Sequence, residues 1–509
     1  MVFLVGAGPG DPQLITLRGA EVLRRADVVV YDSLANPALL RLAPPAAEVV
    51  SRSPEGLRQG QITALKQEDI IKILIARARE GKTVVRLKGG DPYVFGRGGE
   101  EVEALASSGI EFEVVPGVSS ISAVPNYAGI PLTHRLHSSM FTVFTGHEDP
   151  NKPGSAIPWE QVASVPGTKV ILMGAERVSE ITGKLLAGGA SAKTPAAMVE
   201  WGTLGRQRSV VASLGDLAGK AQEAGLGAPS VVVIGDVVSL HKKLGWFANR
   251  PLHGQTVVVT RAKEQAEGLT RALEESGAEV LRLPCIRIET PTDRESLVDA
   301  IAGLNQYDWL VFTSANGVTS FFEHFFKGFE DLRDLGGGRI AAVGPATAAR
   351  LRELHLRVDL LPAEQTAKGL AKALAAQETI ENLKVLLLRA EKANPDLPKL
   401  LSEEGAIVDD VAVYRTVFEE SDPEGTAGRL QSDGVDWITF TSGSTVESLH
   451  ARLDLVALSK KFPKMRFASI GPETSRAIES LGLKVAVEAK PHTEEGLVEA
   501  LLKGPKRRK

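Results

Sequence analysis

Two glycine-dense turns, each directly after an apolar strand, constrain the fold of this chain most strongly. They are Val5-Gly6-Ala7-Gly8-Pro9-Gly10-Asp11-Pro12 and Arg86-Leu87-Lys88-Gly89-Gly90-Asp91-Pro92-Tyr93-Val94-Phe95-Gly96-Arg97-Gly98-Gly99-Glu100-Glu101. The first alone also fits a plain strand-to-helix turn, but the second holds too many special backbone positions for an ordinary connector. Bare backbone lets a ligand approach the main chain closely, so the pair predicts one site for a nucleotide-like cofactor.

From Met1 to about Leu240, short strands rich in Val, Ile and Leu alternate with amphipathic helices. Strands are expected at residues 2–5, 27–31, 83–87, 142–145, 169–173 and 230–234. Near-continuous apolar strands indicate sheets covered on both faces, and therefore an α/β fold. Because 509 residues exceed what one hydrophobic core usually supports, we expect two to four domains.

An internal repeat organises the second half of the chain. Thr313-Ser314 returns 128 residues later as Thr441-Ser442, Gly344-Pro345 returns 127 residues later as Gly471-Pro472, and Arg261 matches Arg389. Two similar α/β lobes are therefore expected. Each Thr-Ser pair ends a strand and precedes a helix, where open α/β sheets bind ligands. Capping of the helix by these hydroxyls is the alternative interpretation.

Composition excludes several classes of function. The formal net charge is −4, from 59 Lys and Arg against 63 Asp and Glu, so the chain lacks the basic surplus of a general nucleic-acid binder. Cys285 is the single cysteine, which rules out an internal disulfide and a cysteine-cluster metal site and predicts a buried thiol. No apolar run reaches the roughly 18 residues of a membrane helix, and no basic leader precedes the first strand. We therefore expect a cytoplasmic protein without membrane or nucleic-acid partners.

The first half resembles the tetrapyrrole methylases, and uroporphyrinogen-III C-methyltransferase in particular. Besides both glycine turns, the resemblance includes Pro116–Ser120, Gly129–Arg135, Thr145-Gly146-His147 and Met173-Gly174. It implies a domain over residues 1–243 with two lobes divided near 116–133, whereas the polar stretch at 151–154 suggests a later hinge. It also implies transfer of two methyl groups from S-adenosylmethionine to uroporphyrinogen III, giving precorrin-2 and S-adenosylhomocysteine. Dimerisation through this half is expected from the resemblance alone.

The resemblance also assigns roles to individual residues of the first half. Cofactor contacts are implied for Pro9, Gly89, Gly90, Asp91, Val94, Ser119, Ser120, Met173 and Gly202. Asp32 follows the strand at 27–31, where the family places a catalytic base, and a helix cap is the alternative. Arg52, Arg97 and Arg135, with Lys88, are expected to bind substrate carboxylates, and a surface or interlobe ion pair is the alternative for Arg97, Arg135 and Lys88. The family often has a proposed proton-donating lysine where this chain has Arg52, whose guanidinium does not readily release a proton.

Residues 254–502 resemble uroporphyrinogen-III synthase, after a linker expected at 244–253 that contains Trp246 and Phe247. The resemblance includes both Thr-Ser turns, both Gly-Pro-x-Thr turns and Val413-Tyr414-Arg415-Thr416. For a domain at 254–505 it implies cyclisation of hydroxymethylbilane to uroporphyrinogen III without a cofactor or metal. Tyr414 matches the tyrosine that the family proposes as an acid, and a buried core tyrosine is the alternative. The expected substrate ligands are Arg261, Thr313, Ser314, Thr441, Ser442 and Thr474.

Three other functions stay open at this stage. A nicotinamide oxidoreductase would need Gly-x-Gly-x-x-Gly, whereas the first turn has its glycines at positions 6, 8 and 10. The second half alone is also compatible with a noncatalytic two-lobed sensor of a tetrapyrrole. The first half is compatible with another corrin-ring methylase, and the direction of the product toward sirohaem or cobalamin is not determined by these motifs.

Overall fold

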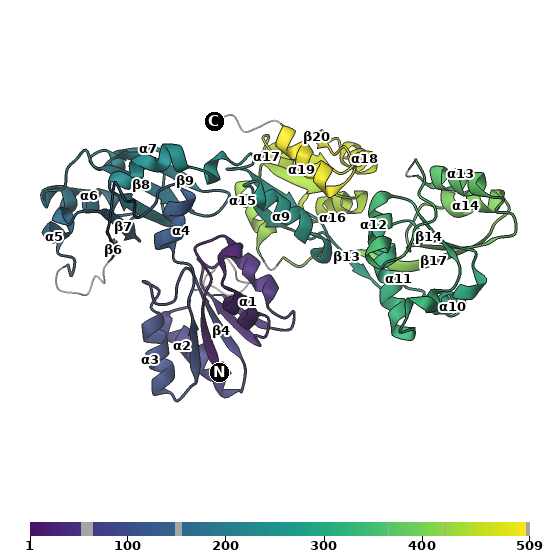
Figure 1. Ribbon diagram of the computed structural model, residues 1–509, viewed down its shortest axis with the longest axis horizontal. Helices are drawn as coiled ribbons and strands as arrows, with labels where there is room; N and C mark the ends of the chain where they lie inside the picture. The colour runs from purple at the N-terminus through teal and green to yellow at the C-terminus, as the bar shows by residue number, and fades with distance from the viewer. Residues whose placement is uncertain (52–64, 148–154, 365, 423, 505–509) are drawn as a thin grey trace.

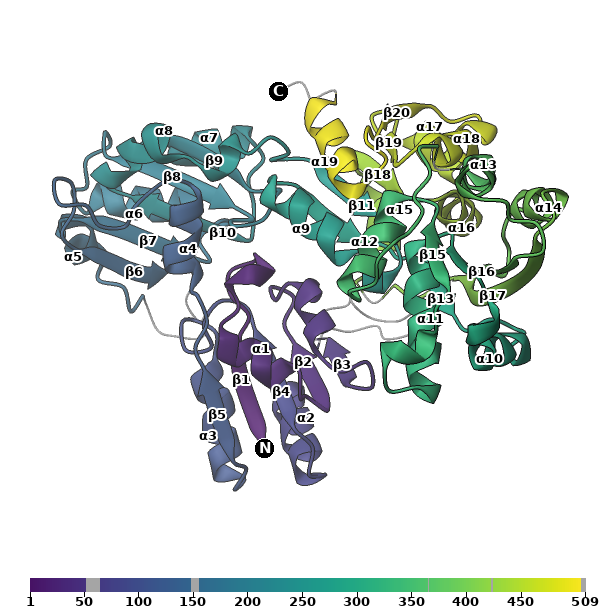
Figure 2. The same cartoon turned by 45° about the vertical axis from the view of Figure 1, so that its right-hand side comes forward.

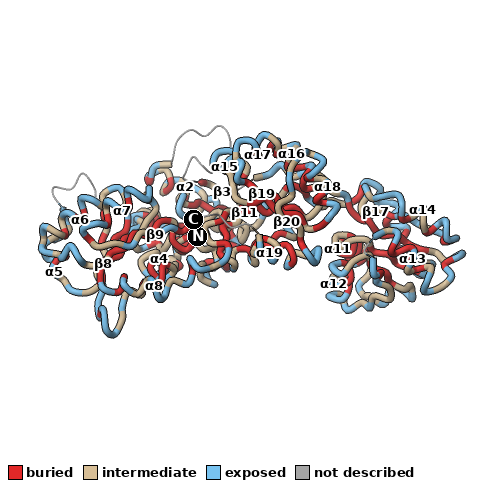
Figure 3. The backbone as a smooth tube through the Cα atoms, turned by 90° about the horizontal axis from the view of Figure 1, so that it is seen from above, coloured by how far each residue is buried: buried red, intermediate tan, exposed pale blue. Residues whose placement is uncertain are grey.

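The protein, described here from a computed structural model, forms four α/β lobes in an elongated arrangement (Figure 1). Residues 1–51, 65–147, 155–364, 366–422 and 424–504 are described, and each lobe contains one five-stranded sheet. The expected substrate ligand Arg52 and the suggested hinge at 151–154 lie outside the described residues. The view from above shows buried residues in the interior and exposed residues at the surface along the length of the molecule (Figure 3).

The first lobe contains a parallel sheet in the order β3-β2-β4-β1-β5. Its elements are β1 (Val2–Gly6), η1 (Pro12–Leu14), α1 (Leu17–Leu23), β2 (Val28–Tyr31), η2 (Pro37–Leu42), β3 (Glu48–Ser51), α2 (Gln67–Arg79), β4 (Val84–Lys88), α3 (Gly98–Ser107) and β5 (Phe112–Val115). Alternate residues of β1 enter two different cores: Phe3 and Val5 one, Val2 and Leu4 the other. The expected sheet with two covered faces is confirmed.

The second lobe has a mixed sheet in the order β6-β7-β10-β8-β9, in which only β6 and β7 pair in parallel among the described strands. Its elements are α4 (Ser120–Tyr127), β6 (Phe141–Thr145), α5 (Trp159–Ser164), β7 (Thr168–Leu172), α6 (Val178–Ala187), β8 (Pro195–Glu200), β9 (Arg208–Ser213), α7 (Leu217–Glu223) and β10 (Ser230–Ile234). Strand β9 follows β8 as a hairpin at the sheet edge, which requires antiparallel pairing.

The segment between the two halves packs tightly instead of forming an extended connector. It contains η4 (Asp236–Leu240), α8 (His241–Leu244) and η5 (Phe247–Asn249). The ring centroid of Tyr127 lies 4.9 Å from that of Trp246 and 4.8 Å from that of Phe247, which is buried. A Cβ atom on Gly129 would lie 2.5 Å from the backbone nitrogen of Gly245. This segment is therefore held against α4.

The second half forms the third and fourth lobes, with sheet orders β12-β11-β18-β19-β20 and β13-β17-β16-β14-β15. The third lobe contains β11 (Thr256–Val259), η6 (Lys263–Gln265), α9 (Glu267–Glu275), β12 (Glu279–Arg282), α15 (Thr426–Asp433), β18 (Trp437–Phe440), α16 (Gly443–Leu453), α17 (Leu455–Lys461), β19 (Arg466–Ser469), α18 (Pro472–Ser480), β20 (Val485–Glu488) and α19 (Glu494–Lys503). The fourth contains β13 (Ile286–Glu289), α10 (Glu295–Ala302), η7 (Leu304–Gln306), β14 (Trp309–Phe312), α11 (Ala315–Gly328), η8 (Leu332–Leu335), β15 (Arg339–Ala342), α12 (Pro345–Glu353), α13 (Ala367–Gln377), β16 (Lys384–Ala390), α14 (Asp396–Glu403) and β17 (Ile407–Phe418).

The two sequence repeats do not coincide with these two lobes. In the first repeat, Arg261 follows β11 of the third lobe, whereas Thr313 follows β14 of the fourth lobe. In the second repeat the order is reversed, because Arg389 lies on β16 of the fourth lobe and Thr441 follows β18 of the third. Each lobe therefore combines the start of one repeat with the end of the other.

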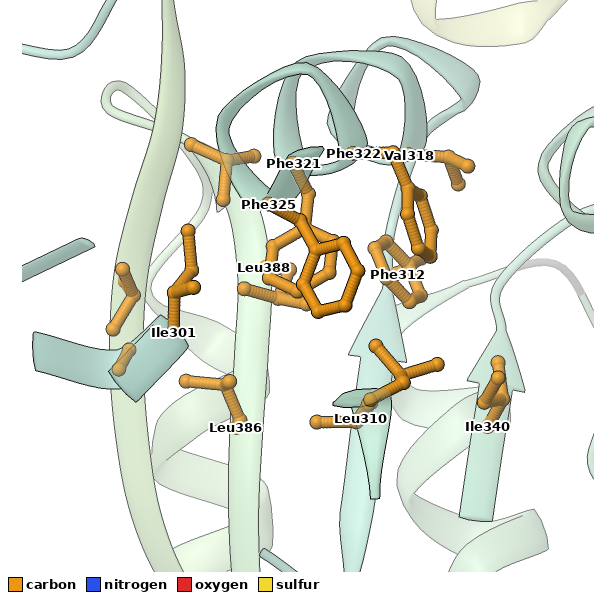
Figure 4. Close-up of a cluster of buried hydrophobic side chains, with 14 of the residues drawn as sticks. Ile301, Leu310, Phe312, Val318, Phe321, Phe322, Phe325, Ile340, Leu386 and Leu388 are labelled. Atoms are coloured by element: carbon orange, nitrogen blue, oxygen red, sulfur yellow. The ribbon is translucent and has the colours of Figure 1, made fainter. Parts of the chain in front are cut away.

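A cluster of aromatic rings forms one core of the fourth lobe, between α11 and its sheet (Figure 4). Phe321 and Phe325, one helical turn apart, are both fully buried, and the ring of Phe321 meets that of Phe312 on β14 at 5.5 Å. The spacing of these apolar residues places them on the helix face that covers the sheet.

The expected burial of Cys285 is confirmed, and it leads to a prediction about reactivity. The thiol is 1% exposed, and burial raises its pKa to about 12. Because the thiolate is the nucleophile, Cys285 should resist iodoacetamide at pH 8 until denaturant opens the third lobe. Mass spectrometry across a urea series checks this, and rapid alkylation without urea would contradict it.

Within the described ranges, no helix is both long enough and apolar enough to span a membrane.

Candidate functional site

The two glycine turns lie side by side at the carboxyl edge of the first sheet. The backbone nitrogen of Gly90 donates to the carbonyl of Gly8 at 2.7 Å, because β1 and β4 are neighbours. A Cβ atom on Gly117 would lie 2.2 Å from the carbonyl oxygen of Gly90, and one on Gly6 would lie 2.4 Å from the Cα of Gly117. Side chains are excluded here, so the two glycine turns and the turn at Gly117 meet through main chain alone.

A cleft of about 1280 Å³ opens next to these turns, between the first and second lobes. It is lined by all nine residues expected to contact the cofactor, namely Pro9, Gly89, Gly90, Asp91, Val94, Ser119, Ser120, Met173 and Gly202. Asp32 and Arg97 also line it, so the structure brings these predicted residues together. Arg135 is exposed outside the described lining of the cleft.

Several lining residues also hold the turns in place. One carboxylate oxygen of Asp91 accepts a bond from the backbone nitrogen of Tyr93 at 2.9 Å, and the other accepts from that of Gly117 at 3.0 Å. The hydroxyl of Ser119 caps α4 by accepting from the backbone nitrogen of Ile121 at 3.2 Å. Asp91 and Ser119 therefore shape the cleft as well as line it.

Asp32 ends a network of buried charges below the cleft. Its carboxylate accepts from the guanidinium of Arg86 at 2.5 Å and lies 3.9 Å from the ammonium of Lys88. Glu101, which is fully buried, pairs with Arg86 at 3.2 Å and Lys88 at 3.1 Å and accepts from the amide of Gln67 at 2.8 Å. The two cations and two carboxylates compensate one another, as charges away from water require.

The network follows from the strand pairing. Arg86 and Lys88 alternate with apolar residues on β4, so both point to the face covered by α2 and α3, where Glu101 lies. Burial lowers the pKa of Lys88. Lys88 is thus an ion-pair partner in the interior of the first lobe, whereas the sequence suggested a substrate ligand or a surface or interlobe ion pair. Two cations at period two within an apolar strand signal a buried acidic partner, but nothing in the sequence identifies Glu101 as that partner.

The cap that was the alternative role of Asp32 is made by another residue, and Arg97 has a local partner. Asn36, and not Asp32, caps the following segment η2 with its side chain. Exposed Arg97 forms an ion pair with Glu100 at 2.6 Å at the start of α3. Charge pairs of this exposed kind contribute little to stability, so Arg97 can exchange its partner for a ligand carboxylate at low cost.

The cleft walls fit a cofactor that is held mainly through main-chain groups. A Cβ atom on Gly90 would meet only the backbone nitrogen of Ser120, at 4.0 Å, so the space between this turn and the start of α4 is open. Ser119 and Ser120 line the cleft at this place, where their hydroxyls can bond to a ligand carboxylate or hydroxyl. Among the described residues, no group of His, Cys, Asp and Glu has the arrangement of a metal site.

The predicted residues of the second half are divided between the third and fourth lobes, which a side-chain contact joins near Arg261 and Ser314. The hydroxyl of Tyr414 lies 3.1 Å from that of Ser314, which caps α11 by accepting from Gly317. The side chain of Gln265 joins the lobes by bonding to Asn316, and Arg261 forms an ion pair with Glu494.

The remaining predicted ligands lie at matching helix starts of the two lobes. Thr313 precedes the cap of α11, Thr441 and Ser442 occupy the equivalent turn before α16, and Thr474 is buried in α18. Ser442 accepts from the backbone nitrogen of Thr445 at 3.4 Å, so both serines cap helices, as the alternative interpretation stated. Sequence reasoning did not single out Gln265, whose role depends on a contact between lobes.

Tyr414 leads to a prediction that separates its hydroxyl from its ring. Its side chain is buried in the core of the fourth lobe, and this burial raises the pKa of the phenol, so the protonated form is present at neutral pH. If it acts as an acid, Tyr414→Phe should preserve folding but slow formation of uroporphyrinogen III by about 100-fold. Tyr307→Phe is the matched control, because the Tyr307 hydroxyl bonds to Asp409 at 2.6 Å on the same lobe. Equal rates for the two variants would contradict the role.

Comparisons with known proteins agree with this division of the chain. The family described as Tetrapyrrole (Corrin/Porphyrin) Methylases matches residues 1–218, and the family described as Uroporphyrinogen-III synthase HemD matches residues 267–499. Porphyrin biosynthesis protein HemD of Ruminiclostridium josui is 38% identical over 98% of this chain and 97% of its own length.

Two further relatives cover less of this chain. Uroporphyrinogen-III C-methyltransferase of Bacillus subtilis is 37% identical over 75% of this chain and 77% of its own length. S-adenosyl-L-methionine-dependent uroporphyrinogen III methyltransferase of Methanosarcina barkeri is 49% identical over 48% of this chain and 94% of its own length.

Together, the lobes, the cleft and these matches define a two-part enzyme of tetrapyrrole biosynthesis. The chain belongs to the tetrapyrrole methylase family in its first half and to the uroporphyrinogen-III synthase family in its second half. It is thus a bifunctional protein with a methyltransferase domain and a synthase domain.

Proposed function

We propose that the second half, residues 254–505, cyclises hydroxymethylbilane to uroporphyrinogen III and that the first half, residues 1–243, methylates this product twice to precorrin-2. S-adenosylmethionine is the methyl donor and S-adenosylhomocysteine the by-product, and the product serves synthesis of sirohaem or cobalamin. The observation that carries the proposal is the single cleft that collects all nine expected cofactor residues beside Asp32.

The cofactor, when bound, supplies an electrophilic methyl group on a sulfonium. Methyl transfer to an electron-rich pyrrole carbon needs mainly orientation, which the main-chain walls at Gly8, Gly90 and Ser120 can provide. The methylated carbon then loses its proton. Asp32 is the base in this proposal, since its carboxylate lines the cleft and is held from behind by Arg86 and Lys88.

Substrate carboxylates need cationic partners at the rim of the cleft. Arg97 lines the cleft and is exposed, as is its ion pair with Glu100, so it is suited to this role. In the synthase half, Arg261, the Thr-Ser turns and Thr474 are proposed to hold the linear substrate in a curl that brings its ends together. Tyr414 is proposed to protonate the departing hydroxyl.

The decisive experiment supplies the purified chain with hydroxymethylbilane and S-adenosylmethionine carrying a labelled methyl group. Doubly labelled precorrin-2, identified by mass spectrometry, is the expected product. Formation of uroporphyrinogen III without label would contradict the methylase proposal. Methylation of added uroporphyrinogen III, without cyclisation of hydroxymethylbilane, would favour a binding role for the second half. Absence of label on added uroporphyrinogen III would favour another corrin-ring methylase specificity.

A homodimer formed through the methylase half is proposed from family resemblance. Light scattering of the full chain should give about twice the 54.2 kDa of one chain. A mass of one chain at micromolar concentration would contradict this part of the proposal.

A further inference from the structure

The third lobe, which belongs to the synthase half, touches both lobes of the methylase half. Figure 2 shows α9 of this lobe beside the second lobe and next to the first. The cleft between the methylase lobes is lined on one side by synthase residues, among them Glu279, Glu424, Thr426 and Arg429. Residues far apart in the sequence therefore share one cavity.

The contact with the second lobe is made by main chain and by charge. The backbone nitrogen of Gly254 donates to the carbonyl of Gly205 at 2.8 Å, and a Cβ atom on Gly205 would lie 2.2 Å from the backbone nitrogen of Glu279. The buried carboxylate of Glu279 pairs with Arg206 of the second lobe at 3.4 Å and with Arg429 of its own lobe at 2.8 Å. Contact this close leaves the two surfaces little freedom to slide.

The contact with the first lobe is a two-pronged ion pair across the cleft. Arg41, on η2, donates through Nε to one carboxylate oxygen of Glu424 at 2.9 Å and through Nη2 to the other at 3.3 Å. The side chain of Arg41 is 20% exposed and that of Glu424 is 19% exposed. A bidentate and largely desolvated pair is directional and stronger than an ordinary surface pair.

These two anchors lie on different methylase lobes but on one synthase lobe. Glu424 lies two residues before the start of α15, and Arg429, on α15, pairs with the anchor residue Glu279. Separation of the methylase lobes therefore requires one anchor to break. If a ligand leaves only when the lobes separate, the free energy of the anchor that must break adds to the barrier to its release.

We propose that the third lobe clamps the methylase cleft, and that the Arg41–Glu424 pair slows the exchange of the cofactor. In this proposal the synthase half affects methylation in two ways: it makes the substrate of the methylase half, and it holds the methylase cleft through this ion pair. The inference depends on the cofactor site proposed above, but not on the tetrapyrrole reaction.

The test uses charge exchange in the full chain and S-adenosylhomocysteine as the probe. Arg41→Glu and Glu424→Arg, each alone, place like charges together and should speed release of the probe about five- to tenfold. The double variant restores opposite charges and should bring release back to within about twofold of the unchanged chain, as coupled residues require. Stopped-flow displacement gives the rates, and titration calorimetry gives the dissociation constants.

Two controls make the result interpretable. Glu420→Arg makes the same change of charge at an exposed position four residues earlier and should leave release unchanged. Glu424→Gln removes the charge without changing size and should speed release less than Glu424→Arg does. Single variants that release at the unchanged rate, or a double variant that shows no recovery, would overturn the clamp. A chain that binds no S-adenosylhomocysteine would instead contradict the proposed cofactor site.

Discussion

Replacement of Asp32 by Asn is expected to lower methyl transfer to uroporphyrinogen III by about 100-fold or more, the range for a removed general base. The amide keeps the size of the carboxylate but cannot accept the proton that the methylated ring must lose. Binding of S-adenosylhomocysteine should persist, because the glycine turns that line the cleft do not depend on that charge. Transfer of labelled methyl groups at saturating cofactor measures the first effect, and calorimetry the second.

Asp27→Asn is the matched control for this experiment. Asp27 precedes the same strand, β2, at its opposite end, where its carboxylate accepts from the backbone nitrogen of Thr83 at 2.8 Å. The same chemical change there lies far from the cleft and should leave the rate near that of the unchanged chain. Equal loss in both variants would show that β2 tolerates no such change, and a normal rate in Asp32→Asn would contradict its role as the base.

Replacement of Glu101 by Ala is expected to destabilise the first lobe by about 3 kcal/mol or more. The change leaves Arg86 and Lys88, both buried, with Asp32 as the one remaining carboxylate of the network. Its neighbour Glu100 makes an exposed pair with Arg97, so Glu100→Ala should cost about 1 kcal/mol at most. One position along the chain thus separates a large effect from a small one.

Calorimetric melting of the full chain measures the difference between these variants. The transition of the methylase half should fall by about 6–12 °C in Glu101→Ala and by a few degrees at most in Glu100→Ala. The transition of the synthase half serves as an internal reference. Similar shifts for the two variants would contradict the assignment of Glu101 as the centre of the buried network.

The place of the two glycine turns could be predicted because their signals are local, whereas the nine expected cofactor contacts came from the family resemblance and stay predictions. A glycine turn after an apolar strand marks the end of that strand, and the carboxyl ends of parallel strands lie at one edge of the sheet. Because β1 and β4 are neighbours, Gly8 and Gly90 lie close together. Asp32 was placed at this edge for the same reason, because it follows the strand at 27–31, and its role as the base stays a prediction. The role of Lys88 was less predictable, since its partner Glu101 is brought to it by the packing of α3 on the sheet.

The repeat in the second half shows what short sequence motifs predict and what they do not. The matching turns at Thr313 and Thr441 correctly indicated two similar lobes, because turn chemistry is specified by neighbouring residues. They did not indicate that the chain crosses between lobes after β12 and returns after β17, so that each lobe takes strands from both repeats. This exchange of strands depends on which strands pair within each sheet, and a short motif does not predict the pairing of strands that are distant in the sequence.

By itself, then, the sequence determined the α/β class, the glycine-lined strand ends and the division into a methylase half and a synthase half. These features depend on residue periodicity, backbone freedom and family motifs, all of which can be recognised within short stretches of the sequence. The tertiary structure alone decided that Arg86 and Lys88 compensate Asp32 and Glu101, and that Glu424 reaches Arg41 across the cleft. Such charge pairs join residues distant in sequence, because burial away from water requires a partner wherever the fold places one.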